Sequence, residues 1–155
     1  MKNKENIKVC LVGSSGGHLT HLYMLKPFWK NKDHFWVTFD KEDARSLLEG
    51  EKMYPCYYPT NRSLKALIKN TKIAWNVLHK EKPDLIISCH CRFINSIKNL
   101  DVDQLCAHHF TNIKKRDRNC CTAGKMVYPI VDKFVVQWEE QKKVYPKAVN
   151  LGSIF

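Results

Sequence analysis

A run of small residues, Gly13-Ser14-Ser15-Gly16-Gly17, follows an apolar segment directly and is itself followed by His18. Glycines let a ligand approach the main chain closely, and free N–H groups at a helix start attract anions. The serine hydroxyls add two hydrogen-bond donors. We interpret the run as a loop that binds a phosphate or diphosphate. The alternative is a tight turn from strand to helix that binds no ligand.

The amino-acid sequence of this loop differs from those of two familiar nucleotide-binding loops. It does not match the dinucleotide pattern G-x-G-x-x-G, although Asp40 lies near the place of a ribose-binding acid. It also lacks the Gly-Lys-Ser/Thr ending of a P-loop. NAD and ATP are therefore minor interpretations, and we predict no cofactor. His18 is the candidate catalytic residue, as a general base or a hydroxyl ligand; a capping or merely exposed role fits its position equally well.

Alternating apolar runs and amphipathic stretches predict the elements that position the loop. Strands are predicted at residues 7–12, 34–39, 53–58, 85–88, 132–137 and 147–151, with 53–58 near an edge because of Pro55. Helices are predicted from Leu19 to Pro27, over 41–48, from residue 61 or 63 to 79, and over 139–144. This alternation indicates an α/β fold, a Rossmann-like doubly wound parallel sheet in a single domain over residues 1–155.

Composition narrows the classes of function. The 155 residues carry a formal charge of +11, which favours an anionic partner. No apolar run approaches the ~20 residues of a membrane-spanning helix, and the first residues do not resemble a secretory signal. We therefore expect a cytoplasmic chain whose seven cysteines are free thiols. No zinc-finger, RRM or basic-zipper signature is present, so nucleic-acid binding is not expected.

Several short segments together resemble a known family. They are Val12–Leu19, Trp36–Asp40, Pro59–Arg62, Lys82–Ser88, Val127–Pro129, Phe134–Glu140 and Leu151–Phe155. They are similar to the accessory subunits of bacterial capsular and exopolysaccharide glycosyltransferases, which include enhancers of a β-1,4-galactosyltransferase. They also resemble the acceptor-binding, membrane-recruiting subunit of the eukaryotic two-part enzyme that adds the second GlcNAc to dolichol-linked GlcNAc. The resemblance covers residues 7–88 and 124–155.

This resemblance implies the N-terminal half of a split GT-B glycosyltransferase, inactive alone. A separate catalytic subunit would supply the UDP-sugar site, with UDP-galactose the expected donor. Residues Gly13 to His18 would face a polyprenyl-diphosphate-linked saccharide, with Asp40 and Arg62 at the border of the same cleft. The catalytic partner would contact Glu139, Glu140, Ile154 and Phe155. The positive charge would hold the chain peripherally at the inner face of the cell membrane.

Residues 89–123 depart from the family pattern and lack a helix or strand period. Potential zinc ligands gather there: Cys89, His90, Cys91, Cys106, His108, His109, Cys120 and Cys121. No pair has the usual C-x₂-C spacing, so we predict no metal site. A zinc-binding or nucleic-acid-binding module centred on residues 89–121 is the alternative function. We favour a local reading-frame change as the cause, over ordinary divergence. Such a change would remove a helix and a strand and leave a degenerate, inactive family member.

Overall fold

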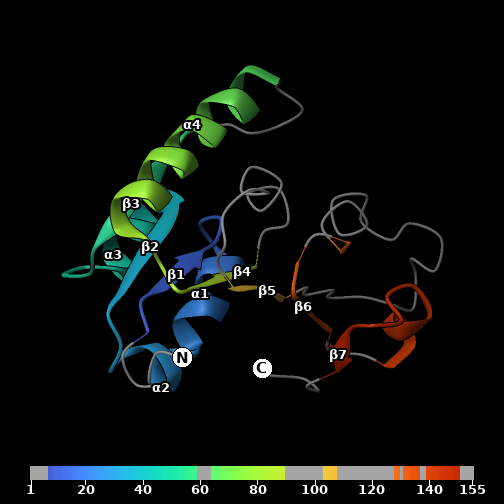
Figure 1. Ribbon diagram of the computed structural model, residues 1–155. Helices are drawn as coiled ribbons and strands as arrows, with labels where there is room; N and C mark the ends of the chain where they lie inside the picture. The colour runs from blue at the N-terminus through green and yellow to red at the C-terminus, as the bar shows by residue number, and fades with distance from the viewer. Residues whose placement is uncertain are drawn as a thin grey trace.

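The computed structural model describes residues 7–58, 64–89, 103–107, 128–129, 131–136 and 139–150. Seven parallel strands form one sheet in the order β3-β2-β1-β4-β5-β6-β7 (Figure 1). The strands are β1 (Val9–Val12), β2 (His34–Phe39), β3 (Met53–Cys56), β4 (Leu85–Ser88), β5 (Asp103–Ala107), β6 (Lys133–Val136) and β7 (Val149–Asn150). Every residue of β1 is buried, as expected of a strand that is covered on both faces.

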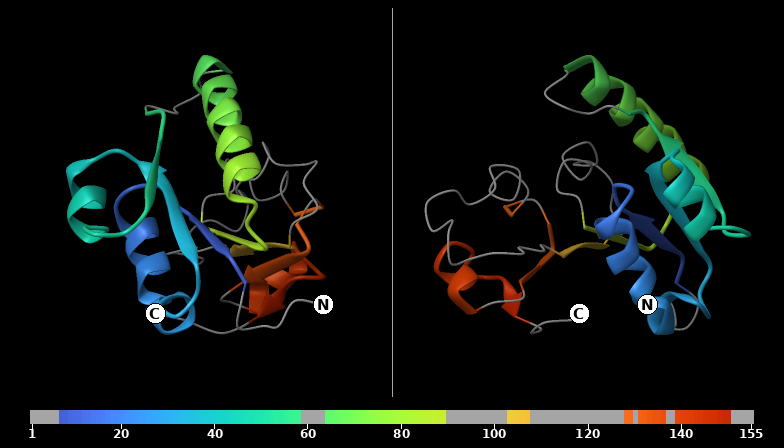
Figure 2. Two further views of the ribbon diagram at one scale, coloured as in Figure 1. Left: turned by 60° about the vertical axis from the view of Figure 1, so that its left-hand side comes forward. Right: turned by 180° about the vertical axis from the view of Figure 1, so that it is seen from behind.

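Helices cover both faces of the sheet. They are α1 (Gly17–Met24), α2 (Lys26–Trp29), α3 (Glu42–Leu47) and α4 (Leu64–Glu81), with a 3₁₀ helix η2 (Glu139–Lys143) before β7. Figure 2 shows α1 and α3 on one side of the first strands and α4 on the other. The packing agrees, because Leu22 of α1 lies in a core with Leu11 and Trp36, whereas Leu78 of α4 lies in a second core.

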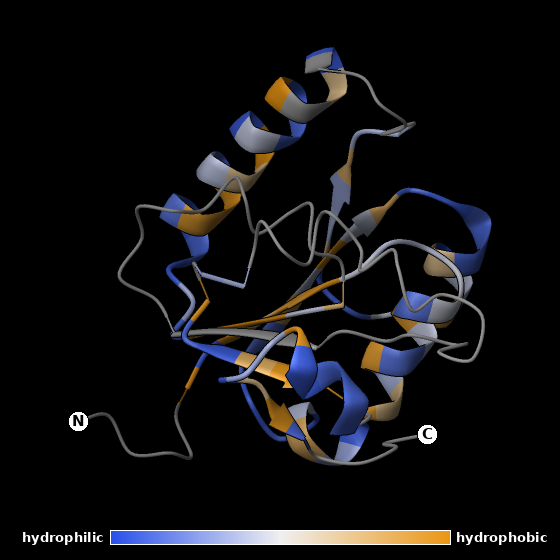
Figure 3. Cartoon of the chain, turned by 90° about the vertical axis from the view of Figure 1, so that its right-hand side faces the viewer, coloured by the Kyte–Doolittle hydropathy of each residue, from blue (hydrophilic) through white to orange (hydrophobic). Residues whose placement is uncertain are grey.

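Aromatic side chains pack against one another on the α1 side of the sheet. Trp29 and Trp36 meet edge to face with ring centroids 5.3 Å apart, and Trp29 Nε1 donates to the carbonyl of Leu22 at 3.1 Å. A third core near β6 contains Phe134 and Tyr145. Figure 3 shows the apolar residues concentrated along the strands, with polar residues on the outer turns of the helices. Burial of these side chains is the main force that holds the helices on the sheet.

Strand order identifies the place where a ligand is expected. The chain builds β1, β2 and β3 outward in one direction, and α4 then returns it to β4 on the opposite side of β1. In such sheets ligands bind beyond the carboxyl ends of the strands at this switch point. Val12, the last residue of β1, pairs with Val37 of β2 and Ser88 of β4. The loop that follows β1 therefore lies between the carboxyl ends of its two neighbours.

The predicted α/β fold is confirmed. β2 and β4 have the predicted bounds, and β3 lies at a sheet edge as predicted. The expectation that the first helix ends at Pro27 is wrong. Leu25 separates α1 from α2, and Pro27 lies within the first turn of α2. Proline fits there because the first N–H groups of a helix have no intrahelical acceptor.

Residues 89–123 show no helix or strand period in the sequence, yet they contain β5. This strand pairs with β4 through Ile86 and Gln104 and with β6 through Cys106 and Phe134. Ladder hydrogen bonds come from the main chain, so a strand between two partners can form without a clear side-chain period. The sheet is therefore continuous across this interval. Residues 90–102 and 108–123, with most of the potential zinc ligands, lie outside the described residues.

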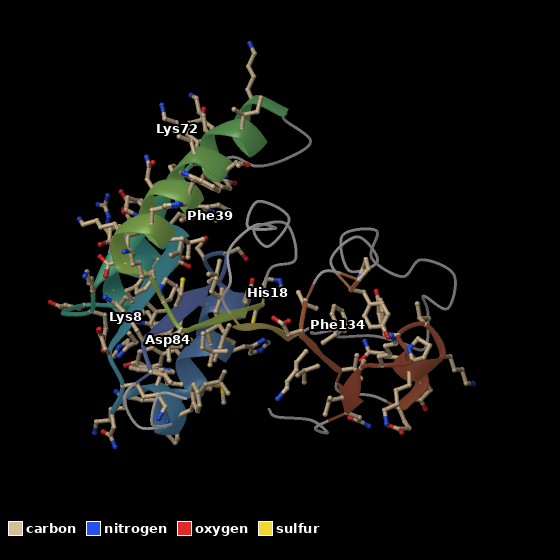
Figure 4. The ribbon with its side chains drawn as sticks, viewed as in Figure 1. Lys8, His18, Phe39, Lys72, Asp84 and Phe134 are labelled. Carbon is tan, nitrogen blue, oxygen red and sulfur yellow. The ribbon has the colours of Figure 1, made fainter. Side chains whose placement is uncertain are left out.

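A buried carboxylate joins α4 to the amino ends of the strands. Glu81, whose side chain is 4% exposed, accepts from Lys8 Nζ at 2.7 Å, from Lys52 Nζ at 2.9 Å and from the Tyr54 hydroxyl. The hydrogen bond from Lys8, followed by that from Tyr54, lowers the pKa of Glu81 to about 2. The nearby Asp84 accepts from the backbone N–H of Lys8 at 2.9 Å. Figure 4 shows Lys8 and Asp84 together at this end of the sheet.

We predict that Glu81→Gln lowers the free energy of unfolding at pH 7 by about 2 kcal/mol, because the ammonium groups of Lys8 and Lys52 lose the buried carboxylate that they share. The folded-state pKa of about 2 lies below the ordinary value of 4.5, so the stabilisation is complete above pH 4.5 and is lost as pH falls through about 2. The difference between wild type and variant should therefore shrink over this window. Urea unfolding at several pH values measures it, with Glu49→Gln as the control on an exposed carboxylate. A pH-independent difference would contradict this explanation.

Candidate functional site

The glycine loop is a turn from β1 into α1 that is fixed at both ends. The N–H of Gly13 donates to the carbonyl of Val37 at 3.2 Å, which attaches the loop to β2. The carbonyl of Gly16 accepts from the N–H groups of Leu19 at 3.0 Å and Thr20 at 3.2 Å, and these bonds start α1. Gly16 has a φ of 83°, which residues with side chains rarely adopt. The predicted order of strand, glycine loop and helix is present.

The glycines of this loop have different structural roles. A Cβ at Gly13 would lie 2.9 Å from Cδ1 of Leu22, a fully buried side chain, so Gly13 allows α1 to approach the sheet. A Cβ built on Gly16 or Gly17 meets no atom within 4 Å, and both glycines are exposed. The main chain is therefore open to a ligand at Gly16 and Gly17, next to the positive end of α1.

A carboxylate already contacts the open part of the loop. The N–H of Gly16 donates to Oδ2 of Asp43, in the first turn of α3, at 2.6 Å. This contact shows that the N–H of Gly16 points toward a position where an anionic oxygen can be held. Asp43 was not among the predicted site residues, because an acidic residue in the first turn of a helix is ordinarily explained by the dipole of its own helix. Its distance from the loop in the sequence gives no sign of the contact.

His18 is the second residue of α1 and is partly exposed, as are Ser14 and Ser15. Figure 4 shows His18 at the end of the sheet where the glycine loop lies. The N–H of Cys89 donates to the carbonyl of Val12 at 3.1 Å, so the end of β4 lies directly beside this loop. The residues from Gly13 to His18 therefore gather at the switch point. Their role toward a ligand stays a prediction.

Asp40 follows β2 at the same edge of the sheet, and its carboxylate is held by Arg45. Arg45 Nε donates to Oδ1 at 2.6 Å and Nη2 donates to Oδ2 at 2.8 Å. These hydrogen bonds are the main cause of the lowered pKa of Asp40. Both side chains are exposed. Asp40 therefore has the predicted location, but a ligand hydroxyl would compete with Arg45 for it; Arg62 lies outside the described residues.

Thr38 is a second residue at this end of the sheet that was not among the predicted site residues. Because Val12 pairs with Val37, Thr38 lies beside Gly13 at the ends of the two strands. It is 1% exposed, and its hydroxyl has no hydrogen-bond partner among the described residues. Threonine is common in strands for its β-branched shape, so its type alone gave no signal. Thr38 differs from an ordinary strand threonine because its hydroxyl is buried beside the glycine loop, where buried polar groups usually have a hydrogen-bond partner.

The two acidic residues predicted to contact a partner are not equivalent. Glu139 accepts from Lys142 Nζ at 2.8 Å and from Asn150 Nδ2 at 2.5 Å, and the Lys142 contact is the main cause of its lowered pKa. Glu139 therefore connects η2 to β7. Glu140 is exposed. Ile154 and Phe155 lie outside the described residues.

The described part of the chain contains neither a group of side chains that could hold a metal ion nor an activated thiol at Cys10 or Cys56. Cys10 and Cys56 are buried free thiols; burial raises the pKa of Cys10 well above its ordinary value and that of Cys56 to about 12. Among the described residues, no three His, Cys, Asp or Glu side chains group closely enough to hold a metal ion. Within the described residues, no helix has the length and apolar character needed to cross a membrane.

The chain is similar in sequence to a human glycosyltransferase subunit. No protein-family model matches the chain. The chain is 25% identical to the human UDP-N-acetylglucosamine transferase subunit ALG14 in an alignment of 186 positions that covers 97% of this chain and 84% of that protein. The identity is low, but the coverage is nearly complete.

Solved structures share the fold. The UDP-GlcNAc 2-epimerase from Methanocaldococcus jannaschii matches 94% of this chain at a TM-score of 0.71 and 13% identity. A glycosyltransferase from Rickettsia africae matches 95% of this chain at a TM-score of 0.70 and 13% identity. The chain spans 45% and 43% of these two structures. It therefore has the fold of a Rossmann-like domain found in GT-B glycosyltransferases and related epimerases, and spans less than half the length of either structure.

We predict opposite stability effects for alanine at the two open glycines. Gly17→Ala should leave the free energy of unfolding unchanged or raise it by about 0.5 kcal/mol, because alanine favours a helix and meets open space. Gly16→Ala should lower it by about 1 kcal/mol, because of the positive φ. Denaturant unfolding compares the two variants. A loss of more than about 1 kcal/mol in Gly17→Ala would show that this part of the loop is not open.

Proposed function

We propose that this chain is the acceptor-binding accessory subunit of a two-component glycosyltransferase. The observation that carries the proposal is its extent of similarity: 97% of the chain aligns with a protein named as a transferase subunit. Its fold is consistent with this proposal, since the chain spans 43% of the length of a glycosyltransferase structure. A separate catalytic subunit would then supply the site for the UDP-sugar. This chain alone would be inactive.

The glycine loop supports a diphosphate-linked acceptor as the ligand. Gly16 directs its N–H at a carboxylate oxygen of Asp43, and Gly17 leaves its main chain open at the start of α1. A phosphate oxygen of a polyprenyl-diphosphate-linked saccharide would replace Asp43 as the acceptor at Gly16. The N–H groups of the first turn of α1 would stabilise the second phosphate. Ser14 and Ser15 would donate further hydrogen bonds.

His18 is the proposed contributor of this chain to the chemical step. In glycosyl transfer, the acceptor hydroxyl forms a bond to the anomeric carbon of the sugar, and the bond from that carbon to UDP breaks. The hydroxyl proton passes to a base. A histidine beside the diphosphate-binding loop is suited to accept it or to orient the hydroxyl. Asp40 and Arg62 would border the saccharide at the same end of the sheet.

The family resemblance suggests the sugar donor, the linkage and the product of the proposed reaction. We propose transfer of β-1,4-linked galactose from UDP-galactose in the synthesis of a capsular polysaccharide or exopolysaccharide. The catalytic subunit would contact Glu140 together with Ile154 and Phe155, whereas Glu139 serves an internal contact. The charge of +11 would attract the chain to the inner surface of the cell membrane, where the lipid-linked acceptor lies.

Reconstituted sugar transfer tests this function. The full chain and its cognate catalytic subunit are assayed alone and together, on membranes that contain the lipid-linked acceptor, with UDP-galactose and UDP-GlcNAc as separate donors. We expect transfer only when both proteins are present, and from UDP-galactose. Transfer by the catalytic subunit alone, unchanged by this chain, would contradict an accessory role and favour a degenerate family member. Transfer from UDP-GlcNAc alone would correct the donor.

Gly17→Ala separates the ligand-binding role of the loop from its structural role. Its added methyl group should reduce kcat/KM for the acceptor about tenfold or more, a loss of about 1.4 kcal/mol. The KM for the UDP-sugar should not change. Asn31→Ala is the matched control, because Asn31 is exposed and precedes the amino end of β2, away from the loop. Equal activity of wild type and Gly17→Ala would exclude the loop from acceptor binding.

A further inference from the structure

The outward face of α4 carries two large apolar side chains in an otherwise basic surface. Ile68 is 69% exposed and Trp75 is 46% exposed. With the exposed residues Lys65, Lys72 and His79 they recur at intervals of three or four residues, so all five lie on one side of the helix. The opposite side packs on the sheet through Ala74, Val77 and Leu78. Core packing therefore accounts for only one side of α4.

Charge on the outward face has a single sign. The lysines of α4 at positions 65, 69, 72 and 80 are exposed, whereas Glu81, the acidic residue in its sequence, is buried between Lys8 and Lys52. The apolar side chains thus have cationic neighbours and no carboxylate of the same helix beside them. A surface of this kind is complementary to an anionic one.

Two exposed tyrosines extend this face at the end of β3. Tyr57 lies under the ammonium group of Lys69, with 4.3 Å from Nζ to the ring centroid, and Tyr58 lies under that of Lys41 at 4.1 Å. Asn70 fixes the strand end to the helix, since its side chain bonds the backbone N–H of Tyr57 at 2.8 Å and its carbonyl at 3.1 Å. Tryptophan, tyrosine and lysine are the residues typical of membrane–water interfaces.

We propose that the outward face of α4, together with Tyr57 and Tyr58, binds the surface of an anionic lipid bilayer. Ile68 and Trp75 would enter the headgroup region while the lysines pair with lipid phosphates. The bilayer is favoured as the occupant because the face combines interfacial aromatic residues with the exposed lysines of α4, with no exposed carboxylate of that helix among them. We call this surface the α4 face; it consists of Lys65, Ile68, Lys72, Trp75 and His79 of α4 together with Tyr57 and Tyr58.

The first turns of α4 lie at the end of the sheet where the acceptor is proposed to bind. Because α4 connects the carboxyl end of β3 to the amino end of β4, its first turns lie at the same end of the sheet as the glycine loop. In Figure 1, α4 extends past the ends of the strands on that side. A bilayer bound at the first turns of α4 would therefore lie near the end of the sheet that carries the glycine loop. The link to the acceptor rests on the proposed function, whereas binding to the bilayer does not require it.

Vesicle binding by the full chain tests the proposal. We expect co-sedimentation with phosphatidylcholine vesicles that contain phosphatidylglycerol, little with phosphatidylcholine alone, and weaker binding as salt rises. Lys65→Gln with Lys72→Gln should weaken binding about fivefold for each charge removed. Ile68→Ser with Trp75→Ser should also weaken it. Lys30→Gln with Lys143→Gln, two exposed lysines outside the α4 face, is the charge-matched control and should bind as wild type apart from a small general loss.

Equal losses in the α4 variant and the control variant would overturn the proposal, as would equal binding to both kinds of vesicle. Loss of binding to the catalytic subunit in the α4 variants, with vesicle binding intact, would assign the face to a protein partner instead. Transfer to an acceptor dispersed in detergent separates this proposal from the proposed function. The α4 variants should keep transfer in detergent and lose it on membranes. Vesicle binding by a wild-type chain that supports no transfer would leave the docking face standing and overturn the proposed function.

Discussion

The pairing of β1 between β2 and β4 is the constraint on which the rest of the structure depends. All three strands are parallel, so their carboxyl ends meet, and the chain reverses its direction across the sheet between β1 and β4. Buried apolar side chains on both faces of β1 fix this arrangement. The loop after β1 must then leave the sheet between two neighbouring strand ends, and α1 must pack closely behind it. Gly13 permits this packing because a Cβ there would meet Leu22.

The same geometry supports the proposal that the loop binds an anionic ligand. Once Gly13 has placed α1 against the sheet, Gly16 turns the chain with a positive φ, and its N–H points at the carboxylate of Asp43. Gly17 then exposes its main chain at the positive end of α1. The carboxylate of Asp43 is bound where a phosphate oxygen of the proposed acceptor would bind. In the proposed complex, a diphosphate, which carries more negative charge than a carboxylate, would replace Asp43 at the N–H of Gly16.

Short-range patterns in the sequence predicted much of this fold. The apolar runs at 34–39 and 85–88 gave strands with the observed bounds, and the long amphipathic stretch gave α4 within a few residues at each end. β5 was missed because it depends on main-chain pairing with β4 and β6 rather than on a side-chain period. At the candidate site the glycines were predicted, since their chemistry is local. Asp43 and Thr38 were missed because the first reaches the loop from α3 and the second lies beside Gly13 only through strand register.

The most direct test of the account is an NMR titration of the full chain with a short-chain prenyl-diphosphate-linked saccharide, following backbone amide shifts. The account predicts that the largest shifts fall on the amides of Gly16 and Gly17, and that the side-chain carboxyl signal of Asp43 moves as it leaves the loop. Inorganic diphosphate should produce the same pattern at higher concentration, because the loop is expected to recognise the diphosphate. Saturable binding with its largest shifts away from residues 13–18, or no change there at saturating ligand, would contradict the central claim that this loop holds the acceptor.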